Sequence, residues 1–360
     1  MRLNSCLSFL CFLFLLTILS CEKEAVTPTT PESPIENPDI DEPPTGDFRV
    51  AFYNVENFFD TVDDPNNPKD DEFLPNAPKQ WTPIRYEEKI RNIGKVARGM
   101  GYPELLGLAE VENAKVLTDL LNSARFETEN YDFVHYNSPD FRGIDVALLY
   151  KKESFEVLES RAIEVELPAE VSEFPTTRDI LEVRGRLFEE EVVVYVNHWP
   201  SRSGGVAATD GKRAYAASVL RAAIDEVLVS APKANIILLG DFNDEPFDDS
   251  LVQALGVKTQ KAGIEDQNAI YNCSVELTMN GEGSSFFRGD WQMLDQILVS
   301  GGLLDSEGTF KVIGYDTYDD ESVLFDHPDD GLIPNRTYGG DNYFGGFSDH
   351  LAVYVEIENL

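Results

Sequence analysis

The feature that most constrains the fold is a set of short apolar runs that each stop at a polar side chain. The run IILL at 236–239 leads directly into Gly240, Asp241, Phe242 and Asn243. Apolar runs of this length, bounded by turn-forming residues, are typical of buried strands. A polar residue at a strand end is commonly only a turn former or a cap. If several such ends lie at one edge of a sheet, however, their side chains form a cleft.

The same pattern recurs along the chain. Polar residues stand at the ends of other apolar runs, namely Asn54 after RVAFY, Glu110 after LLGLA, Asn197 and His198 after VVVYV, Asp295 before QILVS, and Ser348, Asp349 and His350 before LAVYVEI. Carboxylates and amides are oxygen ligands for hard cations, and histidine exchanges a proton near neutral pH. Convergence of these ends would therefore give a site with metal ligands, a base and phosphate donors.

The order of the predicted elements indicates an α+β fold. Helical spacing predicts helices over 86–100, 113–123 and 213–230, and apolar runs predict strands over 48–55, 104–111, 144–150, 191–199, 235–239, 295–300 and 351–357. Strands follow one another without a helix between 144 and 199, which favours α+β, or a sandwich with outer helices, over a doubly wound sheet. We expect one domain over 47–360, with 60–80 and 314–346 as insertions.

The N-terminal segment has the sequence pattern of an export signal. Its apolar run Leu7–Leu19 has 13 residues, fewer than the roughly 20 that span a bilayer. The sequence Ile18-Leu19-Ser20-Cys21 resembles a bacterial lipobox, which predicts a signal peptide over 1–20 and a lipid on Cys21; an ordinary signal peptide cut nearby is the alternative. Residues 21–46 are rich in proline and acids and predict a linker. We therefore expect an exported protein, lipid-anchored to the bacterial membrane on its periplasmic or cell-surface side.

Cysteine count and charge limit what the domain can be. Only Cys273 lies beyond the N-terminal segment, so we expect no intramolecular disulfide, and Cys273 as a buried apolar residue. The net charge of −36 counts against tight nonspecific binding of nucleic acid. It does not exclude an enzyme that holds a phosphodiester weakly, since metal ions can neutralise substrate charge locally. We expect a monomer.

Six motifs, taken in order, resemble a known superfamily. They are NVENFFD (54–60), GLAEVEN (107–113), NHWPSR (197–202), GDFNDEP (240–246), LDQILVS (294–300) and FSDH (347–350). Together they resemble the endonuclease/exonuclease/phosphatase superfamily, which contains pancreatic deoxyribonuclease and the exonuclease III-like repair enzymes. NVENFFD followed by W-x-x-x-x-Y-x-x-K, from Trp81 to Lys89, is similar to secreted bacterial endonucleases. The resemblance implies a four-layer αββα sandwich and metal-dependent attack of water on phosphorus.

The resemblance also implies a metal site. Glu110 takes the metal-ligand role, with Asn54 and Asp349 completing or flanking the shell, and the ion is Mg²⁺ or Mn²⁺, with Ca²⁺ possible. Glu112 competes with Glu110, because residues two apart in a strand share a face.

Catalytic roles follow from the same resemblance. His350 is the expected general base, oriented by Asp295. Asp241 and Asn243 are expected to position the water and bind a phosphate oxygen. His198 is expected to contact the scissile phosphate.

Arg178 and Asn197 each have two interpretations. Arg178 contacts phosphate, or it forms an ion pair with Asp179 or Glu182. Asn197 supports the site, or it hydrogen-bonds within the core. We assign no role to His135 or His327.

Several acids are expected to be plain loop acids, namely Glu56, Asp244 and Glu245. The acidic stretch at 60–73 could be a calcium loop, but it lacks the central glycine of the EF-hand pattern. A solvated acidic loop is the favoured interpretation.

The favoured function is a surface-tethered nuclease acting on DNA or RNA. An alternative on the same fold is a phosphatase or phosphodiesterase of small or lipid phosphates, such as an inositol phosphate or sphingomyelin. A catalytically silent binding protein is a third possibility, against which stand the intact acids and His350. A glycosidase with paired carboxylates receives little weight, because acids are abundant throughout the chain.

Overall fold

The structure of the protein, a computed structural model, describes residues 47–360 apart from 66, 68, 260–263 and 265. The predicted signal segment 1–20 and the linker 21–46 lie outside the described residues, so both stay predictions. Among the described helices, none combines the length and apolar character that crossing a bilayer requires.

Two six-stranded mixed sheets form the centre of the fold. The first sheet has the order β13 (Phe310–Thr317), β18 (Val353–Asn359), β1 (Asp47–Phe58), β2 (Leu105–Val111), β4 (Asp145–Lys151), β3 (Tyr131–His135). The second has the order β5 (Phe155–Ile163), β6 (Ile180–Leu187), β7 (Glu190–His198), β8 (Asn235–Asp241), β12 (Asp295–Ser300), β9 (Ile270–Asn272). Only β1 with β2 and β7 with β8 pair in parallel among these strands.

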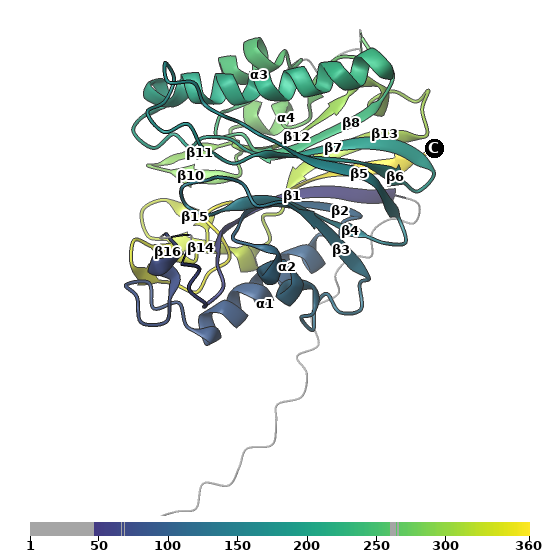
Figure 1. Cartoon of the computed structure of the whole chain (residues 1–360). Coiled ribbons are helices and arrows are strands. Elements are labelled where there is room, and N and C mark those ends of the chain that lie inside the picture. The colour runs from purple at the N-terminus through teal and green to yellow at the C-terminus, as the bar shows by residue number, and fades with distance from the viewer. Residues whose placement is uncertain (1–46, 66, 68, 260–263, 265) are drawn as a thin grey trace, which may run out of the picture. The chain divides into compact units, whose positions relative to one another are not determined.

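Helices cover the outer face of each sheet. Helices α1 (Pro83–Gly99) and α2 (Ala114–Leu121) pack on the first sheet, and α3 (Val206–Ser230) packs on the second (Figure 1). The apolar side chains between the two sheets form a separate central core. This arrangement confirms the α+β, four-layer αββα sandwich expected from the motifs.

Shorter elements connect the layers. They are η1 (Asp70–Phe73), η2 (Ser250–Leu255), η3 (Gly301–Leu303), η4 (Glu321–Val323), α4 (Val275–Met279) and the hairpins β10 (Ser285–Phe287) with β11 (Asp290–Gln292), β14 (Leu324–His327) with β15 (Gly331–Pro334), and β16 (Tyr338–Gly339) with β17 (Asn342–Tyr343).

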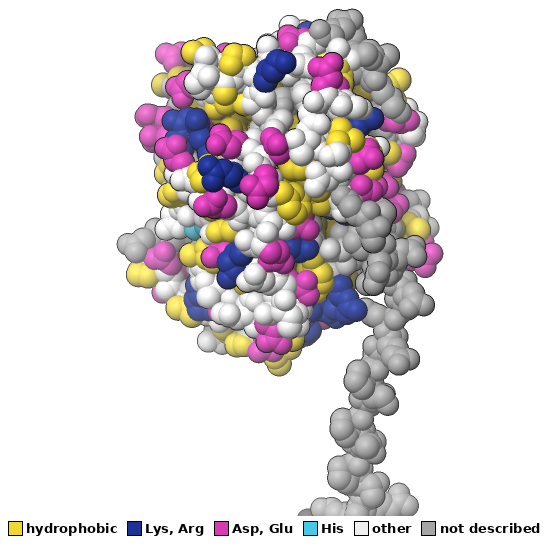
Figure 2. Space-filling view, turned by 90° about the vertical axis from the view of Figure 1, so that its right-hand side faces the viewer, with side chains coloured by type: hydrophobic (Ala, Val, Ile, Leu, Met, Phe, Trp, Pro, Cys, Tyr) yellow, Lys and Arg dark blue, Asp and Glu magenta, His cyan; other side chains and the backbone are white. Residues whose placement is uncertain are grey.

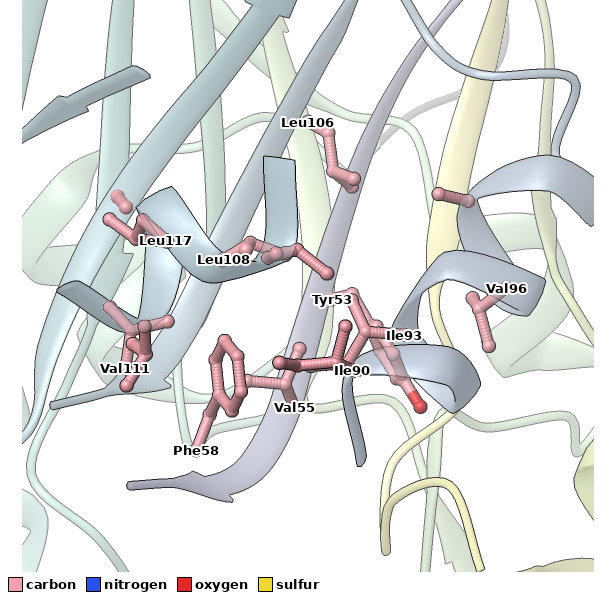
Figure 3. Close-up of a cluster of buried hydrophobic side chains, with 14 of the residues drawn as sticks. Tyr53, Val55, Phe58, Ile90, Ile93, Val96, Leu106, Leu108, Val111 and Leu117 are labelled. Atoms are coloured by element: carbon pink, nitrogen blue, oxygen red, sulfur yellow. The ribbon is translucent and has the colours of Figure 1, made fainter. Parts of the chain in front are cut away.

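Strand β1 explains why the sequences of the central strands are continuous runs of apolar residues. Alternate side chains point to opposite faces of a strand. Val50 and Phe52 lie in the core between the sheets, whereas Tyr53 and Val55 lie in the core beneath α1. Figure 3 shows the second pair beside the side chains of Ile90 and Ile93 of α1. Both faces are buried, so no polar alternation remains to mark the strand.

Two helices begin earlier than their apolar spacing predicts. Helix α1 begins at Pro83, three residues before 86, because the hydroxyl of Thr82 caps it and accepts a hydrogen bond from the N–H of Arg85. Helix α3 begins at Val206 rather than at 213. Its first turns carry mainly small and polar residues, so they show no apolar stripe from which a helix could be predicted.

The prediction that 314–346 is an insertion is wrong for its first residues. Residues 310–317 form β13, an edge strand of the first sheet that pairs with β18. A shift of register between Val312 and Gly314 breaks the alternation by which a strand is predicted. Cys273 is partly buried against the core between the sheets, close to the expectation for it.

The surface of the domain carries charges of both signs. Figure 2 shows the side on which the C-terminus lies in Figure 1, and there acidic and basic side chains are interspersed. On this face the acidic side chains do not form one continuous patch.

Candidate active site

The polar strand ends do converge, because of how the strands run. Parallel strands end at the same edge of a sheet, so β1 ends beside β2, and β7 beside β8. Strands β12 and β18 run the opposite way and begin at those edges, since Asp295 pairs with Asp241 and Val353 pairs with Phe52. A hydrogen bond of 3.1 Å from Asn54 Nδ2 to Asp241 Oδ2 joins the two sheets here.

His350 and Asp295 form a buried pair at this edge. His350 Nδ1 lies 2.6 Å from Asp295 Oδ2, and Asp295 is fully buried. The hydroxyl of Ser284 donates to the same carboxylate oxygen at 2.6 Å, and accepts a hydrogen bond from the N–H of Asp295. The predicted orientation of His350 by Asp295 is thus present in the structure.

The pair changes the role that His350 can take. Burial alone would lower the pKa of His350, but the adjacent Asp295 carboxylate holds that pKa well above its ordinary value, and Asp241 and Asp349 add to the effect. A raised pKa favours the protonated imidazole, which can donate a hydrogen bond or a proton. General-base catalysis by His350 stays a prediction.

Asp241 lies beside this pair, and its pKa is raised as well. Its Oδ2 accepts from Asn54, and its Oδ1 accepts from the N–H of Asn243 at 2.9 Å. Burial, and then the nearby Asp295 carboxylate, raise the pKa of Asp241 above its ordinary value. A carboxylate with a raised affinity for a proton is the group best suited here to take one from water.

Glu110 stands at a break in strand β2. Its φ of +65° and the register shift against β4 between Ala109 and Val111 mark a bulge that re-aims the side chain. The carboxylate accepts from the N–H of Asn57 at 2.9 Å and from Arg142 Nη1 at 3.0 Å. Burial raises the pKa of Glu110, but the Arg142 guanidinium outweighs it and holds that pKa well below its usual range, so the carboxylate is charged.

The bulge separates Glu110 from Glu112. Glu112 was expected on the same strand face, but its Oε2 accepts from the N–H of Asp60 at 2.7 Å, in the acidic loop. Burial raises the pKa of Glu112 to about 8, and the neighbouring acids Asp60, Asp70 and Asp64 add to the rise. Glu110, by contrast, lies near His198.

His198 is held as a neutral imidazole. It is 3 % exposed, and its Nε2 lies 3.6 Å from Asp241 Oδ2. Burial, and then the Arg178 guanidinium, lower the pKa of His198 well below its ordinary value. Its Nδ1 is buried without a hydrogen-bond partner among the described residues.

Arg336 pairs with Asp349, which is the other carboxylate expected to bind the metal. Arg336 Nη2 lies 3.1 Å from Asp349 Oδ2 and 3.8 Å from Glu56 Oε1. Glu56, expected to be a loop acid, is 3 % exposed and accepts from the N–H groups of Thr337 and Tyr338. It is a structural residue that fixes the segment leading to Asp349.

Two predicted substrate-binding residues, Asn197 and Arg178, make contacts within the protein. Asn197 is fully buried, donates to the carbonyls of Tyr195 and Leu239 and accepts from the indole of Trp199, which settles its two interpretations in favour of the core. Arg178 donates to the carbonyls of His198 and Trp199 and pairs with Asp140 at 3.1 Å.

The ion pair of Arg178 has another partner than expected, since its acidic partner is Asp140 rather than Asp179 or Glu182. Each of its three nitrogens donates to a protein group, and contact with phosphate stays a prediction. Glu182 pairs with Arg161 and Arg184.

Some residues of the GDFNDEP motif lie in the candidate site, and others support the fold around it. Phe242 is fully buried and packs edge-on against Trp199, as expected. Asn243 has a φ of +51° and donates its amide to the carbonyl of Trp199 at 3.0 Å, so that N–H is not available to phosphate. Asp244 is 2 % exposed and lies 2.7 Å from Nε of the buried Arg213, which corrects its expected role as a loop acid.

Sequence reasoning missed Arg142, Lys89 and Ser284. Arg142 follows no predicted strand and belongs to none of the six motifs, so the sequence gives no signal for its role. Lys89 was noted within W-x-x-x-x-Y-x-x-K, and its buried ammonium donates to Thr337 Oγ1 and to the carbonyl of Phe347 at 2.7 Å each. The two histidines without an expected role, His135 and His327, pair with Asp145 and Asp330.

The donor set fits a hard divalent cation. Glu110 offers a charged carboxylate, and Asn54 and Asp349 offer further oxygens from the same edge. Asp241, Asp295 and His350 also present ligand atoms within 4.8 Å of one another. All these donors except the imidazole are oxygens, which Mg²⁺ and Mn²⁺ prefer.

Comparison with known proteins gives a consistent result. The sequence model of the Endonuclease/Exonuclease/phosphatase family matches residues 49–359. No curated protein sequence matches the chain. Among solved structures, the human Nocturnin catalytic domain with bound sulfate is 16 % identical with a TM-score of 0.52, over 88 % of this chain and 95 % of that one.

Two further structures share the fold. A Bacteroides thetaiotaomicron endonuclease/exonuclease/phosphatase family protein is 15 % identical with a TM-score of 0.52, over 87 % of this chain and 96 % of that one. A D. rerio TDP2 complexed with a single-strand DNA product is 14 % identical with a TM-score of 0.51, over 87 % and 99 %. At these identities the likeness concerns the fold.

Proposed function

The chain belongs to the endonuclease/exonuclease/phosphatase family, and from that premise we propose that it is a divalent-metal-dependent phosphodiester hydrolase acting on DNA or RNA. The observation that carries this proposal is the meeting of Asp241, Asp295 and His350 at one edge, where one ligand atom from each lies within 4.8 Å of the others. A carboxylate that can accept a proton, beside an imidazole held by a second carboxylate, suits acid–base chemistry.

The side chains of the site suit attack of water on phosphorus. The Asp241 carboxylate takes the proton of the attacking water, and the Asn54 amide fixes one of its oxygens. The protonated His350, held by Asp295, donates to a phosphate oxygen and offsets the charge that develops there. The neutral His198 supplies a further N–H from the second sheet.

A cation completes this chemistry. A bound Mg²⁺ or Mn²⁺ would supply positive charge at the phosphate oxygens, and Glu110, with Asn54 and Asp349, would hold it. Arg142 and Arg336 already place positive charge against two of these carboxylate groups, which supports binding of an anionic substrate in an otherwise acidic protein.

Nucleic acid is the favoured substrate. The structure of D. rerio TDP2, which shares the fold, contains a single-strand DNA product. The motif NVENFFD resembles secreted endonucleases. With a lipid on Cys21 and the linker 21–46, the enzyme would act from the membrane surface, outside the cytoplasm. Replacement of Cys21 by serine, followed by mass spectrometry and membrane fractionation, tests the anchor by itself.

The test of activity is a substrate panel. Protein lacking residues 1–46 is incubated with plasmid DNA, RNA and a series of phosphate esters in Mg²⁺, Mn²⁺ or Ca²⁺, with an EDTA control. We expect cleavage of nucleic acid that EDTA abolishes. His350→Ala should lower the rate by about 10² or more, as removal of an acid–base group does. His327→Ala is the matched control, because His327 pairs with Asp330 in a hairpin loop.

A second candidate is a phosphatase or phosphodiesterase of small phosphates. The net charge of −36 favours it, because a strongly acidic protein repels a polyanion more than a small ester. Turnover of small esters without cleavage of DNA or RNA would select this candidate. No turnover of any substrate with any of the three ions would refute both.

A further inference from the structure

The acidic loop 60–73 holds more negative charge than its surroundings neutralise. Asp63, Asp70 and Asp71 each present a carboxylate oxygen, and these oxygens lie within 4.8 Å of one another. Asp63 and Asp71 are exposed, but Asp70 is only 2 % exposed and Asp60 is also buried. The expectation of a solvated loop therefore fails for Asp60 and Asp70.

Asp70 is aimed into the cluster with one oxygen unused. Its Oδ2 accepts from the N–H of Asp64 at 2.7 Å, whereas its Oδ1 is buried and has no hydrogen-bond partner among the described residues. A buried carboxylate oxygen without a donor is costly, unless it coordinates a cation. This orphaned oxygen is independent of the acid count and points to a ligand.

A further buried acid lies behind the cluster. Glu112 is buried, and its Oε2 accepts from the N–H of Asp60. The pKa of Asp70 is raised by burial and then, among its neighbours, by Asp63, Asp71 and Asp64. These carboxylates thus repel one another in the folded chain.

Three bases in or beside this loop have other partners. Lys69, next to Asp70, places its ammonium 4.9 Å from the ring centre of Phe141. Lys115 pairs with Asp119 at 2.5 Å, and Arg142 pairs with Glu110. A cation from solution would offset the charge of the three aspartates.

We propose that Asp63, Asp70 and Asp71 bind a calcium ion, separate from the metal of the active site. Three carboxylate oxygens within 4.8 Å of one another are close enough to share one ion. Ca²⁺ accepts six to eight oxygens in irregular geometry, as an exposed loop offers, whereas Mg²⁺ demands a near-ideal octahedron.

The site is coupled to the loop that carries Arg142. Asn67 packs so closely against Gly143 that a Cβ atom there would lie 1.9 Å from the Asn67 side-chain nitrogen. Lys69 covers Phe141 in the same loop. A cation that fixes 60–73 therefore also fixes 140–143, from which Arg142 reaches Glu110.

Calorimetric titration of the metal-stripped protein with CaCl₂ tests the proposal. The titration is done in the Glu110→Gln background, so that the active-site ligand is removed and failure of the proposed function does not affect the result. We expect one Ca²⁺ bound, at least tenfold weaker binding after Asp70→Asn or Asp63→Asn, and unchanged binding after Asp319→Asn. Asp319 is exposed and lies outside the loop, so this change alters the net charge equally.

Two further measurements separate binding from a folding defect. In EDTA, Asp70→Asn should melt at the same temperature as its parent or higher, because it removes repulsion. Ca²⁺ should slow tryptic cleavage after Lys69 in the parent and not in Asp70→Asn. The proposal is overturned if both loop variants bind Ca²⁺ as the parent does, if the parent binds none, or if Mg²⁺ raises the melting temperature as much as Ca²⁺.

Discussion

Arg142 Nη1 lies 3.0 Å from Glu110 Oε1, so the carboxylate expected to hold the metal is paired with a guanidinium. Arg142 Nη2 also donates to Asn57 Oδ1 at 2.6 Å. The side chain of Arg142 is 40 % exposed and that of Glu110 11 %, so the arginine lies at the mouth of the site. Arginine and metal compete for the same charge, and an arginine displaced from Glu110 would be free to bind phosphate.

Arg142→Ala should separate these two effects. Removing the competitor should lower the Mg²⁺ concentration needed for half-maximal activity. Loss of a charge-assisted contact of about 1.5 kcal/mol should raise KM by about tenfold. Activity measured over a grid of metal and substrate concentrations checks both. Arg221→Ala on α3 removes only a surface pair with Asp225, and it should change neither parameter. An unchanged metal requirement in Arg142→Ala would disprove the competition.

Glu110→Gln and Glu112→Gln should differ although they lie two residues apart. The first should lower kcat by about 10² or more, because it removes the charged metal ligand. The second should keep activity and should stabilise the metal-free protein increasingly as pH rises above the ordinary range of a glutamate, with the full gain above about pH 8, since the pKa of Glu112 is raised to about 8 in the folded protein. Rates and thermal melting in EDTA check the pair. Equal losses of kcat would contradict the assignment.

Asp295→Asn should move the alkaline limb of the pH–rate profile to lower pH. The Asp295 carboxylate holds the pKa of His350 well above 6.5, so the active protonated form persists through neutral pH in the parent. A raised folded-state pKa also stabilises the protein fully below about pH 6.5, and this stability is lost as pH rises through the folded value. Both the rate limb and the fall in melting temperature should therefore shift in the variant. A profile identical to that of the parent would refute a protonated His350.

Asp244→Ala should destabilise the fold by about 3 kcal/mol, because it leaves the buried Arg213 guanidinium with only the exposed Asp210 as an acidic partner. Asp225→Ala, which breaks an exposed pair on α3, should change the free energy of unfolding by less than about 0.5 kcal/mol. Urea denaturation followed by circular dichroism measures both. Similar values for the two variants would show that Asp244 is a solvated loop acid after all.

The layers and the site edge could be predicted from sequence because they depend on local patterns. Apolar runs gave the central strands, and the order of the motifs placed Asp241, Asp295 and His350 together. Early starts of α1 and α3 could not be predicted, since Thr82 acts through a cap and the first turns of α3 carry no apolar stripe.

The details of the site depended on features without a sequence signature. The alternation of side chains along a strand predicts Glu110 and Glu112 on one face. The bulge at Glu110 interrupts this alternation, so the two side chains lie apart. Asn197 and Asn243 have the residue type of phosphate donors, yet the carbonyls of neighbouring residues occupy their amides. Arg142 comes from a loop that only tertiary packing brings to the site.

Strand β1 enters the fold at Asp47, beside Glu358 of β18, and reaches Asn54 seven residues later. At about 3.3 Å per residue, Asn54 lies roughly 23 Å from that entry point. Both ends of the folded unit thus lie at the far end of the first sheet from the catalytic residues. Immobilising the domain by either end should leave its active edge open, and joining the two ends by a short peptide should allow a circularly permuted enzyme.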